Sequence, residues 1–172
     1  MIHDVELNGL TFDASFDSGN AARIEALAED EFALWTARDC EGTEHENGCR
    51  TWFSFSVRGA TQGRTLTFHI RNMNSQGNLF RQGHVPCFRS LPSQPEWERL
   101  PTAVTFRGGK GADKYREMRE NRDYVGAGEE FTIRFDHSVE TPAGDTLYFA
   151  FCFPESYTDP AARLAWLDSI FG

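Results

Sequence analysis

The 172-residue sequence has no long apolar run, because no stretch of about 18 consecutive apolar residues occurs in it. A membrane-spanning helix is therefore excluded. The first residues also lack the basic and apolar segments of a signal peptide. No Asn-x-Ser/Thr glycosylation site is present, and Cys87 and Cys152 lie among apolar neighbours, as buried thiols do. Together these features predict a protein of the reducing cytosol.

Familiar catalytic motifs are missing as well. The sequence contains no Walker-A loop, no G-x-S-x-G elbow and no motif centred on a nucleophilic cysteine. The glycines at positions 59 and 63 indicate a turn between strands, since no helix start follows them. From the residues alone, we predict a soluble all-β domain without an evident active site.

Charge is unevenly distributed in this acidic chain, whose formal net charge is −9. Residues 50–99 have no lysine and only two acids, so their balance is +5 and the rest of the chain carries −14. The seven arginines of this stretch are Arg50, Arg58, Arg64, Arg71, Arg81, Arg89 and Arg99. They indicate either an ordinary solvated surface with internal acidic partners or a basic face for an acidic partner. The overall acidity argues against nucleic-acid binding, which needs a broad cationic surface.

Alternating apolar residues predict several short strands, and the 15 phenylalanines favour a sheet. The predicted strands cover residues 7–16, 31–36, 52–57, 64–70, 130–135 and 146–153, with shorter ones within 85–91 and 97–100. Residues 21–27 fit either a strand or a short helix. The short glycine-containing connection between 52–57 and 64–70 predicts a hairpin that would place Arg58 and Arg64 beside its turn.

Other segments predict loops and one helix. Residues 37–49 and 72–83 are polar loops, and 110–128 resembles a charged surface insertion with some helix. Asp159 as N-cap and Pro160 as first helical residue predict a helix over 161–170. The predicted fold is mostly β: an antiparallel β-sandwich over residues 1–158, with a short C-terminal helix in residues 159–172.

Three sets of residues could bind a metal, and each is a weak candidate. His3/Glu6 and His137/Glu140 have the H-x-x-E spacing, but glutamate is common here and His3 lies near the chain start. Cys40, His45 and Cys49 supply three zinc-compatible ligands on one loop. A fourth would have to come from Asp39, Glu41, Glu44 or Glu46. We therefore predict no catalytic residue and no metal ligand in this chain.

A series of short blocks resembles the N-terminal region of cytosolic carboxypeptidases, a family of metallocarboxypeptidases, and is nearest to its type-5 members. The blocks occur in the family's order and cover nearly the whole chain. They lie at residues 16–20, 35–40, 44–48, 52–59, 72–74, 79–83, 97–99, 149–154 and 157–159. The residues that carry the family signature are Phe16, Ser18, Gly19, Asn20, Trp52, Phe53, Gly83, Trp97 and Pro154.

The resemblance implies a β-sandwich that precedes and contacts a zinc peptidase domain. It implies that the whole protein removes glutamates from polyglutamylated proteins, above all tubulin. It also implies a cytoplasmic location, with association to microtubules or cilia. The family's zinc ligands, H-P-G-E and a distant His, match no position here, so the resemblance implies no cofactor in this chain.

Three hypotheses remain open. The chain is an accessory domain that supports the peptidase domain and shapes substrate access, an independent module for an acidic partner, or a carbohydrate-binding sandwich with exposed Trp35, Trp52 or Trp97. We expect Asn20, Asn72 and Asn74 to be structural anchors. The candidate substrate or interdomain contacts are Arg58, Arg71, Asn72, Asn74, Arg81, Tyr157 and Asp159.

Overall fold

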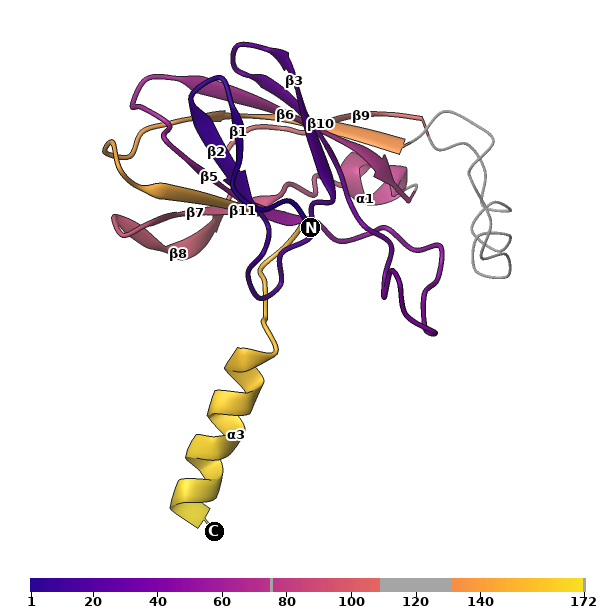
Figure 1. The fold of residues 1–172 in the computed structure, drawn as a ribbon, viewed down its shortest axis with the longest axis vertical. Coiled ribbons are helices and arrows are strands. Elements are labelled where there is room, and N and C mark those ends of the chain that lie inside the picture. Colours follow the sequence, from indigo (N-terminus) through magenta and orange to yellow (C-terminus); the bar gives the residue numbers. More distant parts are fainter. Residues whose placement is uncertain (75, 109–130, 172) are drawn as a thin grey trace.

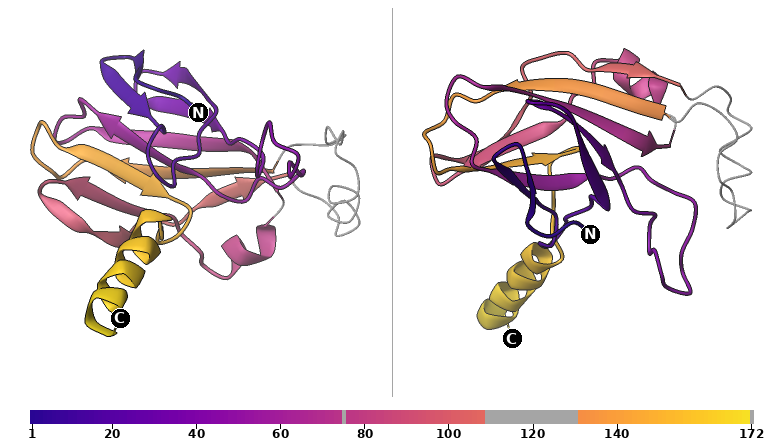
Figure 2. Two further views of the ribbon diagram at one scale, coloured as in Figure 1. Left: turned by 60° about the horizontal axis from the view of Figure 1, so that its bottom comes forward. Right: turned by 45° about the horizontal axis from the view of Figure 1, so that its top comes forward.

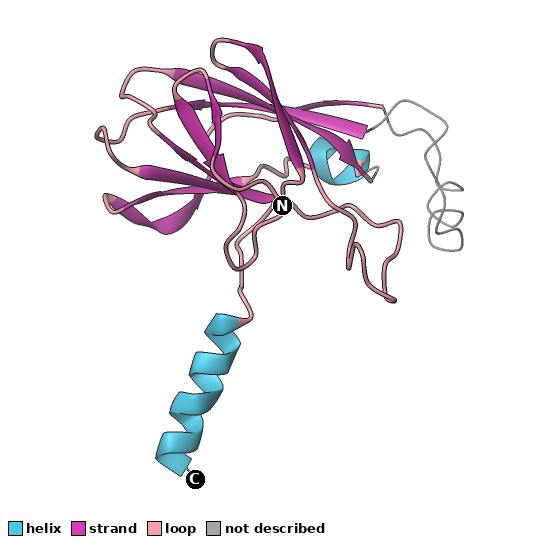
Figure 3. Ribbon diagram, in the orientation of Figure 1, coloured by secondary structure: helices cyan, strands magenta, loops and turns pink. Residues whose placement is uncertain are grey.

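Two facing sheets form the protein, as the computed structural model shows for residues 1–74, 76–108 and 131–171 (Figures 1 and 3). Sheet A has the strand order β1-β2-β5-β11-β7-β8, and sheet B has the order β3-β4-β6-β10-β9. The predicted antiparallel sandwich with a C-terminal helix is therefore confirmed. One described pair departs from the pattern, since β4 and β6 run parallel. The predicted insertion at 110–128 lies outside the described residues.

The strands are short, and burial alternates along β2 and β6, whereas β4 and β5 are buried over most of their length. Their bounds are β1 Val5–Leu7, β2 Leu10–Asp13, β3 Arg23–Ala28, β4 Glu31–Trp35, β5 Ser54–Arg58, β6 Thr65–Met73, β7 Cys87–Leu91, β8 Gln94–Arg99, β9 Thr105–Arg107, β10 Phe131–Ser138 and β11 Thr146–Ala150. The helices of the described residues are α1, Gly77–Arg81, within the predicted loop 72–83, and α3, Thr158–Phe171. No helix among the described residues has the length and apolarity needed to cross a bilayer.

The predicted strand at 7–16 is confirmed only over β2, because its first residues form the end of β1 and the turn of a hairpin. β1 pairs with β2, with Leu7 opposite Leu10, and the turn consists of Asn8 and Gly9, which both have positive φ. An Asn-Gly pair accepts this left-handed backbone, which matches the twist of the flanking strands. The ambiguous segment 21–27 forms strand β3.

The predicted hairpin between 52–57 and 64–70 is wrong. β5 lies in sheet A between β2 and β11, whereas β6 lies in sheet B between β4 and β10. The connection therefore crosses from one sheet to the other. Alternation shows which side chains of a strand face the interior, but both sheets share that interior, so it cannot assign a strand to a sheet.

The core between the sheets consists largely of phenylalanine rings. Phe68 in sheet B lies 4.9 Å from Phe149 and 5.2 Å from Phe55, ring centre to ring centre, and both partners belong to sheet A. Phe135 of β10 lies beside it at 5.4 Å. These tilted and edge-on contacts are the preferred geometry of aromatic pairs, so the rings bind the two sheets together.

Helix α3 projects away from the sandwich on the side of sheet A, and the two further views agree on this placement (Figure 2). None of its residues is buried. It begins at Thr158, before the predicted cap Asp159, whose carboxylate instead accepts hydrogen bonds from the Ser156 backbone N–H at 3.2 Å and hydroxyl at 2.9 Å. The predicted helix is thus present and slightly longer than expected.

The thiols fit the sequence interpretation only in part. Cys87 is fully buried, but Cys152 is partly exposed, and all four cysteines are free.

Among other buried polar groups, the Asp145 carboxylate accepts hydrogen bonds from Ser90 Oγ at 2.7 Å and from Ser93 Oγ. These bonds lower the pKa of Asp145 and hold the β7–β8 turn against the start of β11.

Candidate functional site

The predicted metal candidates do not assemble into a site. Cys40, His45 and Cys49 are not among the residues whose ligand atoms converge in the described part of the chain. The group that does converge is His3, Asp4 and Asp13, with ligand atoms within 4.8 Å of one another.

These three side chains are already engaged with protein groups. His3 Nδ1 lies 3.0 Å from Ser15 Oγ and 3.2 Å from Asp13 Oδ1, while Asp4 pairs with Arg58. His3 is 72% exposed, so water competes for every ligand position. The arrangement is a hydrogen-bonded surface network and does not fit a preformed zinc site.

His137, the other histidine with H-x-x-E spacing, lies in the core. Its ring contacts Phe88 at 4.7 Å and Phe149 at 5.1 Å. Burial disfavours the imidazolium form and lowers the pKa of His137 from 6.5 to about 4. A ring in these surroundings is a packing residue.

The low pKa of His137 makes stability depend on pH. Between pH 6.5 and 4 the unfolded chain binds a proton that the folded chain excludes, so the free energy of unfolding decreases as the pH falls. We expect this histidine to account for a loss of about 3 kcal/mol by pH 4. In His137→Leu, denaturant titrations at pH 7.5, 5.5 and 4.5 should show a pH dependence smaller by about 2.5 kcal/mol over that range. The exposed His45→Leu serves as control, and equal slopes for both variants would contradict the assignment.

Three asparagines hold the two ends of the polar loop 37–49. Asn20 Oδ1 accepts a hydrogen bond from Ala37 N at 2.9 Å, and its amide donates to Trp52 O at 3.0 Å. Asn72 accepts from Thr36 N at 2.8 Å and donates to Thr36 O at 2.9 Å.

Asn74, which is buried, accepts a hydrogen bond from the Arg50 backbone N–H at the other end of this loop. The three side chains thus take the place of missing strand partners, the geometry expected of structural anchors. The same bonds leave Asn72 and Asn74 little capacity for substrate.

The arginines of residues 50–99 do not all contribute to one basic face. Arg58 pairs with Asp4, and Arg64 Nε donates to Asp30 Oδ1 at 2.8 Å. Arg64 precedes β6 and Arg71 lies near its other end, so seven residues of extended chain, about 23 Å, separate them. Arg58 and Arg64 therefore have acidic partners within the chain, and Arg71 lies apart from Arg64, toward the opposite end of β6.

The remaining candidate contacts lie on different surfaces. Arg81 at the end of α1 donates to Asn78 Oδ1 at 2.6 Å, with its guanidinium 5.5 Å from the Phe106 ring centre. Tyr157 is 86% exposed beside the start of α3, where Asp159 also lies. The structure thus brings Tyr157 and Asp159 together but separates them from the arginine candidates.

No tryptophan of the sandwich forms the exposed platform that a carbohydrate-binding protein would use. Trp35, Trp52 and Trp97 are each partly buried. The Arg23 guanidinium lies 4.2 Å from the Trp35 ring centre, and Trp52 Nε1 donates to Ser18 O at 2.7 Å. These contacts use the rings for packing.

Arg89 was not singled out among the arginines by sequence reasoning, but its surroundings differ from those of the others. Its guanidinium carbon lies 4.8 Å from the Trp97 ring centre and 5.1 Å from that of Tyr148. Arg89 lies in β7 and Trp97 in the antiparallel neighbour β8, at the irregularity that shifts the register between Phe88 and Ser90, so spacing in the sequence does not indicate their contact. We call Arg89, Trp97 and Tyr148 the Arg89 clamp.

The signature turn 16–20 joins the sandwich to α3. Phe16 contacts Tyr148 edge-on at 5.4 Å, and Gly19 N donates to Phe16 O at 2.9 Å. Asp17 accepts hydrogen bonds from Thr158 Oγ1 at 2.7 Å and Thr158 N at 3.2 Å. The bond from the Thr158 hydroxyl is the main cause of the lowered pKa of Asp17. This exposed junction ties the start of α3 to the first hairpin.

Other signature residues are structural. Phe53 is buried in the core, and Gly83 has φ +90° after α1, a backbone conformation that favours glycine. Pro154 lies partly buried in the segment between β11 and α3.

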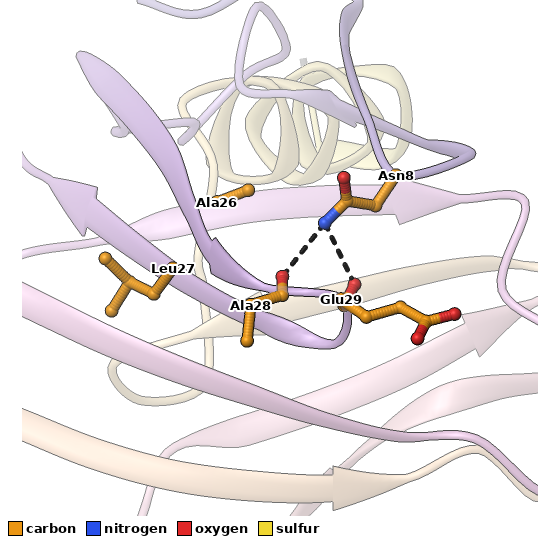
Figure 4. A pocket seen from close by; sticks show the side chains of 5 residues that line it. All are labelled: Asn8, Ala26, Leu27, Ala28 and Glu29. Carbon is orange, nitrogen blue, oxygen red and sulfur yellow. Dashed lines mark hydrogen bonds between the residues drawn. The ribbon is translucent and has the colours of Figure 1, made fainter.

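An open depression of about 480 Å³ lies between the first hairpin and β3 (Figure 4). Its lining residues are Asn8, Ala26, Leu27, Ala28 and Glu29. Asn8 Nδ2 donates to Ala28 O at 2.9 Å and to Glu29 O at 3.1 Å, so its amide already serves the fold. With Glu29 as the only ionisable lining residue, the depression has no set of groups for acid–base or nucleophilic catalysis.

Comparison with known proteins identifies the family of this chain. Residues 12–152 match the family described as "Cytosolic carboxypeptidase N-terminal domain". Cytosolic carboxypeptidase-like protein 5 of Mus musculus is 37% identical over 98% of this chain. Cytosolic carboxypeptidase 6 of Mus musculus is 32% identical over 87% of it. The chain covers only 20% and 24% of these two relatives.

The fold also resembles part of a solved enzyme. The metallo-carboxypeptidase of Burkholderia cenocepacia superposes with a TM-score of 0.58 at 18% identity, over 91% of this chain and 32% of that one. At this identity the likeness shows the fold alone. The family match and the identity to the curated relatives go further: the chain belongs to the cytosolic carboxypeptidase family and comprises its N-terminal domain.

Proposed function

We propose that this chain is the accessory domain of a zinc metallocarboxypeptidase that removes glutamates from polyglutamylated tubulin in the cytoplasm, at microtubules or cilia. It supports the peptidase domain and shapes substrate access. The observation that carries the proposal is the family match over residues 12–152 of a chain that spans about a fifth of its curated relatives.

The chemistry of the histidines supports placing zinc outside this chain. The convergent group around His3 is exposed and hydrogen-bonded to protein side chains, and His137 is buried among phenylalanines. In this proposal zinc and the catalytic residues belong to the peptidase domain, and this chain contributes packing surface and position.

We expect the isolated 172-residue chain to fold but to release no glutamate from a polyglutamate peptide, even with zinc supplied. A longer polypeptide that includes the peptidase domain should release glutamate, and a chelator should abolish that activity. Both proteins are assayed side by side for free glutamate. Chelator-sensitive release by the isolated chain would overturn the accessory role. An inactive longer polypeptide would contradict the proposed activity.

The carbohydrate-binding hypothesis loses its basis, because the sandwich tryptophans pack against protein groups. Binding of an acidic partner keeps one supporting observation. Arg71 and Arg89 each have a buried Nε without a hydrogen-bond acceptor among the described residues.

A further inference from the structure

A row of planar side chains crosses the outer face of sheet A. It runs from Phe16 through Tyr148 and Arg89 to Trp97, with neighbouring groups 5.4, 5.1 and 4.8 Å apart. The Arg89 guanidinium lies between two rings, which fix its orientation and reduce the conformational entropy that it would lose on binding.

Arg89 lacks a polar partner within the described residues, unlike Arg58 of the same sheet. Its Nε is buried without an acceptor, and no ion pair or hydrogen bond to its guanidinium is present within residues 1–74, 76–108 and 131–171. By contrast, Arg58 in the same sheet pairs with Asp4. A buried N–H donor of a charged group is unfavourable while it lacks a hydrogen-bond acceptor. An acceptor that reached Arg89 would therefore bind favourably.

Two further features lie on the same side of the sandwich. The Asp17–Thr158 bonds start α3 next to Phe16, at one end of the row. Helix α3 then runs out on the side of sheet A (Figures 1 and 2). Its apolar side chains are uncovered, with Leu164 at 60%, Trp166 at 61% and Ile170 at 52% exposure. Contiguous exposed apolar side chains of this size are typical of a surface that another protein part covers.

We propose that the outer face of sheet A, centred on the Arg89 clamp, is the face that docks the peptidase domain, and that a carboxylate of that domain is the missing partner of Arg89. This inference rests on the proposed function and specifies its interface. A carboxylate fits because the planar guanidinium donates two parallel hydrogen bonds to it. The clamp contains a single cation, which suits a singly charged carboxylate better than a phosphate dianion.

The test compares Arg89→Met in the 172-residue chain and in the longer polypeptide with the peptidase domain. Methionine keeps an apolar stem between the rings and removes the unpaired donors. In the short chain, we expect stability to be unchanged or slightly raised. In the longer polypeptide, amides of β7 and β8 should exchange with deuterium about ten- to a hundredfold more slowly than in the short chain, the factor for a hydrogen bond to a charged group. Arg89→Met should remove most of that protection.

Arg58→Met is the matched control, since it removes an arginine of the same sheet that already has a partner. It should leave the protection of β7 and β8 intact. Equal exchange of these strands in both lengths would show that sheet A is not the docking face. Protection that survives Arg89→Met would remove Arg89 as its anchor.

A third experiment tests whether Arg89 binds a separate acidic molecule instead of the peptidase domain. If hexaglutamate binds the short chain and changes Trp97 fluorescence in a way that Arg89→Met abolishes, while the longer polypeptide leaves β7 and β8 unprotected, the site serves another molecule and the docking proposal fails. Glutamate release by the longer polypeptide is measured in parallel. An active enzyme with an uncovered sheet A would refute the docking face alone and leave the proposed function standing.

Discussion

Gly19→Ala should prevent the domain from reaching its native fold. A Cβ atom at position 19 would lie 2.1 Å from Ala14 O and 2.7 Å from Ala14 C. Both are backbone atoms and cannot rotate away, so the turn 16–20 would have to open. We expect a loss above about 4 kcal/mol, the range of exceptional single substitutions, measured by denaturant titration or as failure to obtain folded protein.

Opening this turn would also affect its neighbours. Asn20, which anchors the start of loop 37–49, directly follows Gly19, and Asn20 N donates to Ser54 O at 2.8 Å. Gly63→Ala provides the matched control, because Gly63 has φ +90° but open space around the position of a Cβ. That variant carries backbone strain alone and should lose about 1–2 kcal/mol. Equal losses for the two variants would mean that the close approach to Ala14 has no energetic weight.

Phe68→Ala should produce the largest loss among core truncations at the centre of the sandwich. Phe68 is fully buried, and its ring contacts Phe55 and Phe149 of the opposite sheet as well as Phe135 of its own. Removing it leaves a cavity bounded by rings on both sheets, which cannot close without moving strands. We expect a decrease of about 3–5 kcal/mol in the free energy of unfolding, from urea titration monitored by tryptophan fluorescence.

The control is Phe171→Ala, since Phe171 is 81% exposed at the end of α3. The free energy of unfolding of this variant should stay within about 0.5 kcal/mol of the wild-type value. A change below about 1 kcal/mol for Phe68→Ala would contradict the view that this ring joins the two sheets.

The sequence predicted where strands lie better than it predicted which strands pair with one another. Alternation at 31–36, 64–70 and 146–153 located β4, β6 and β11, because a half-buried strand needs an apolar residue at every second position. The same pattern could not reveal that β5 and β6 belong to different sheets. The turn at Asn8-Gly9 was readable, since Asn-Gly between apolar residues is a strong hairpin signal, and overlooking it produced one strand where two exist.

The sequence predicted the role of a candidate residue only where nearby residues determine that role. Asparagines near turns were expected to satisfy backbone groups, and Asn20 and Asn72 do so. Their partners at Thr36 and Ala37 are distant in sequence and follow from the fold. Arg58 and Asp4 are 54 residues apart, so their ion pair could not be read from spacing. Arg89 depends on three strands at once, which places the clamp beyond any local pattern.

The order of strands in the two sheets also bears on how the chain folds during synthesis. β10 and β11 come last among the strands, yet β10 lies between β6 and β9, and β11 lies between β5 and β7. Before residues 131–150 leave the ribosome, β5, β6 and β7 each lack a partner along one edge, and β9, at the end of its sheet, lacks the partner β10. Unpaired edges of Phe-rich strands are templates for pairing with other chains. Ribosomes translating this segment in close succession would therefore bring together nascent chains at the stage when they are most prone to aggregate.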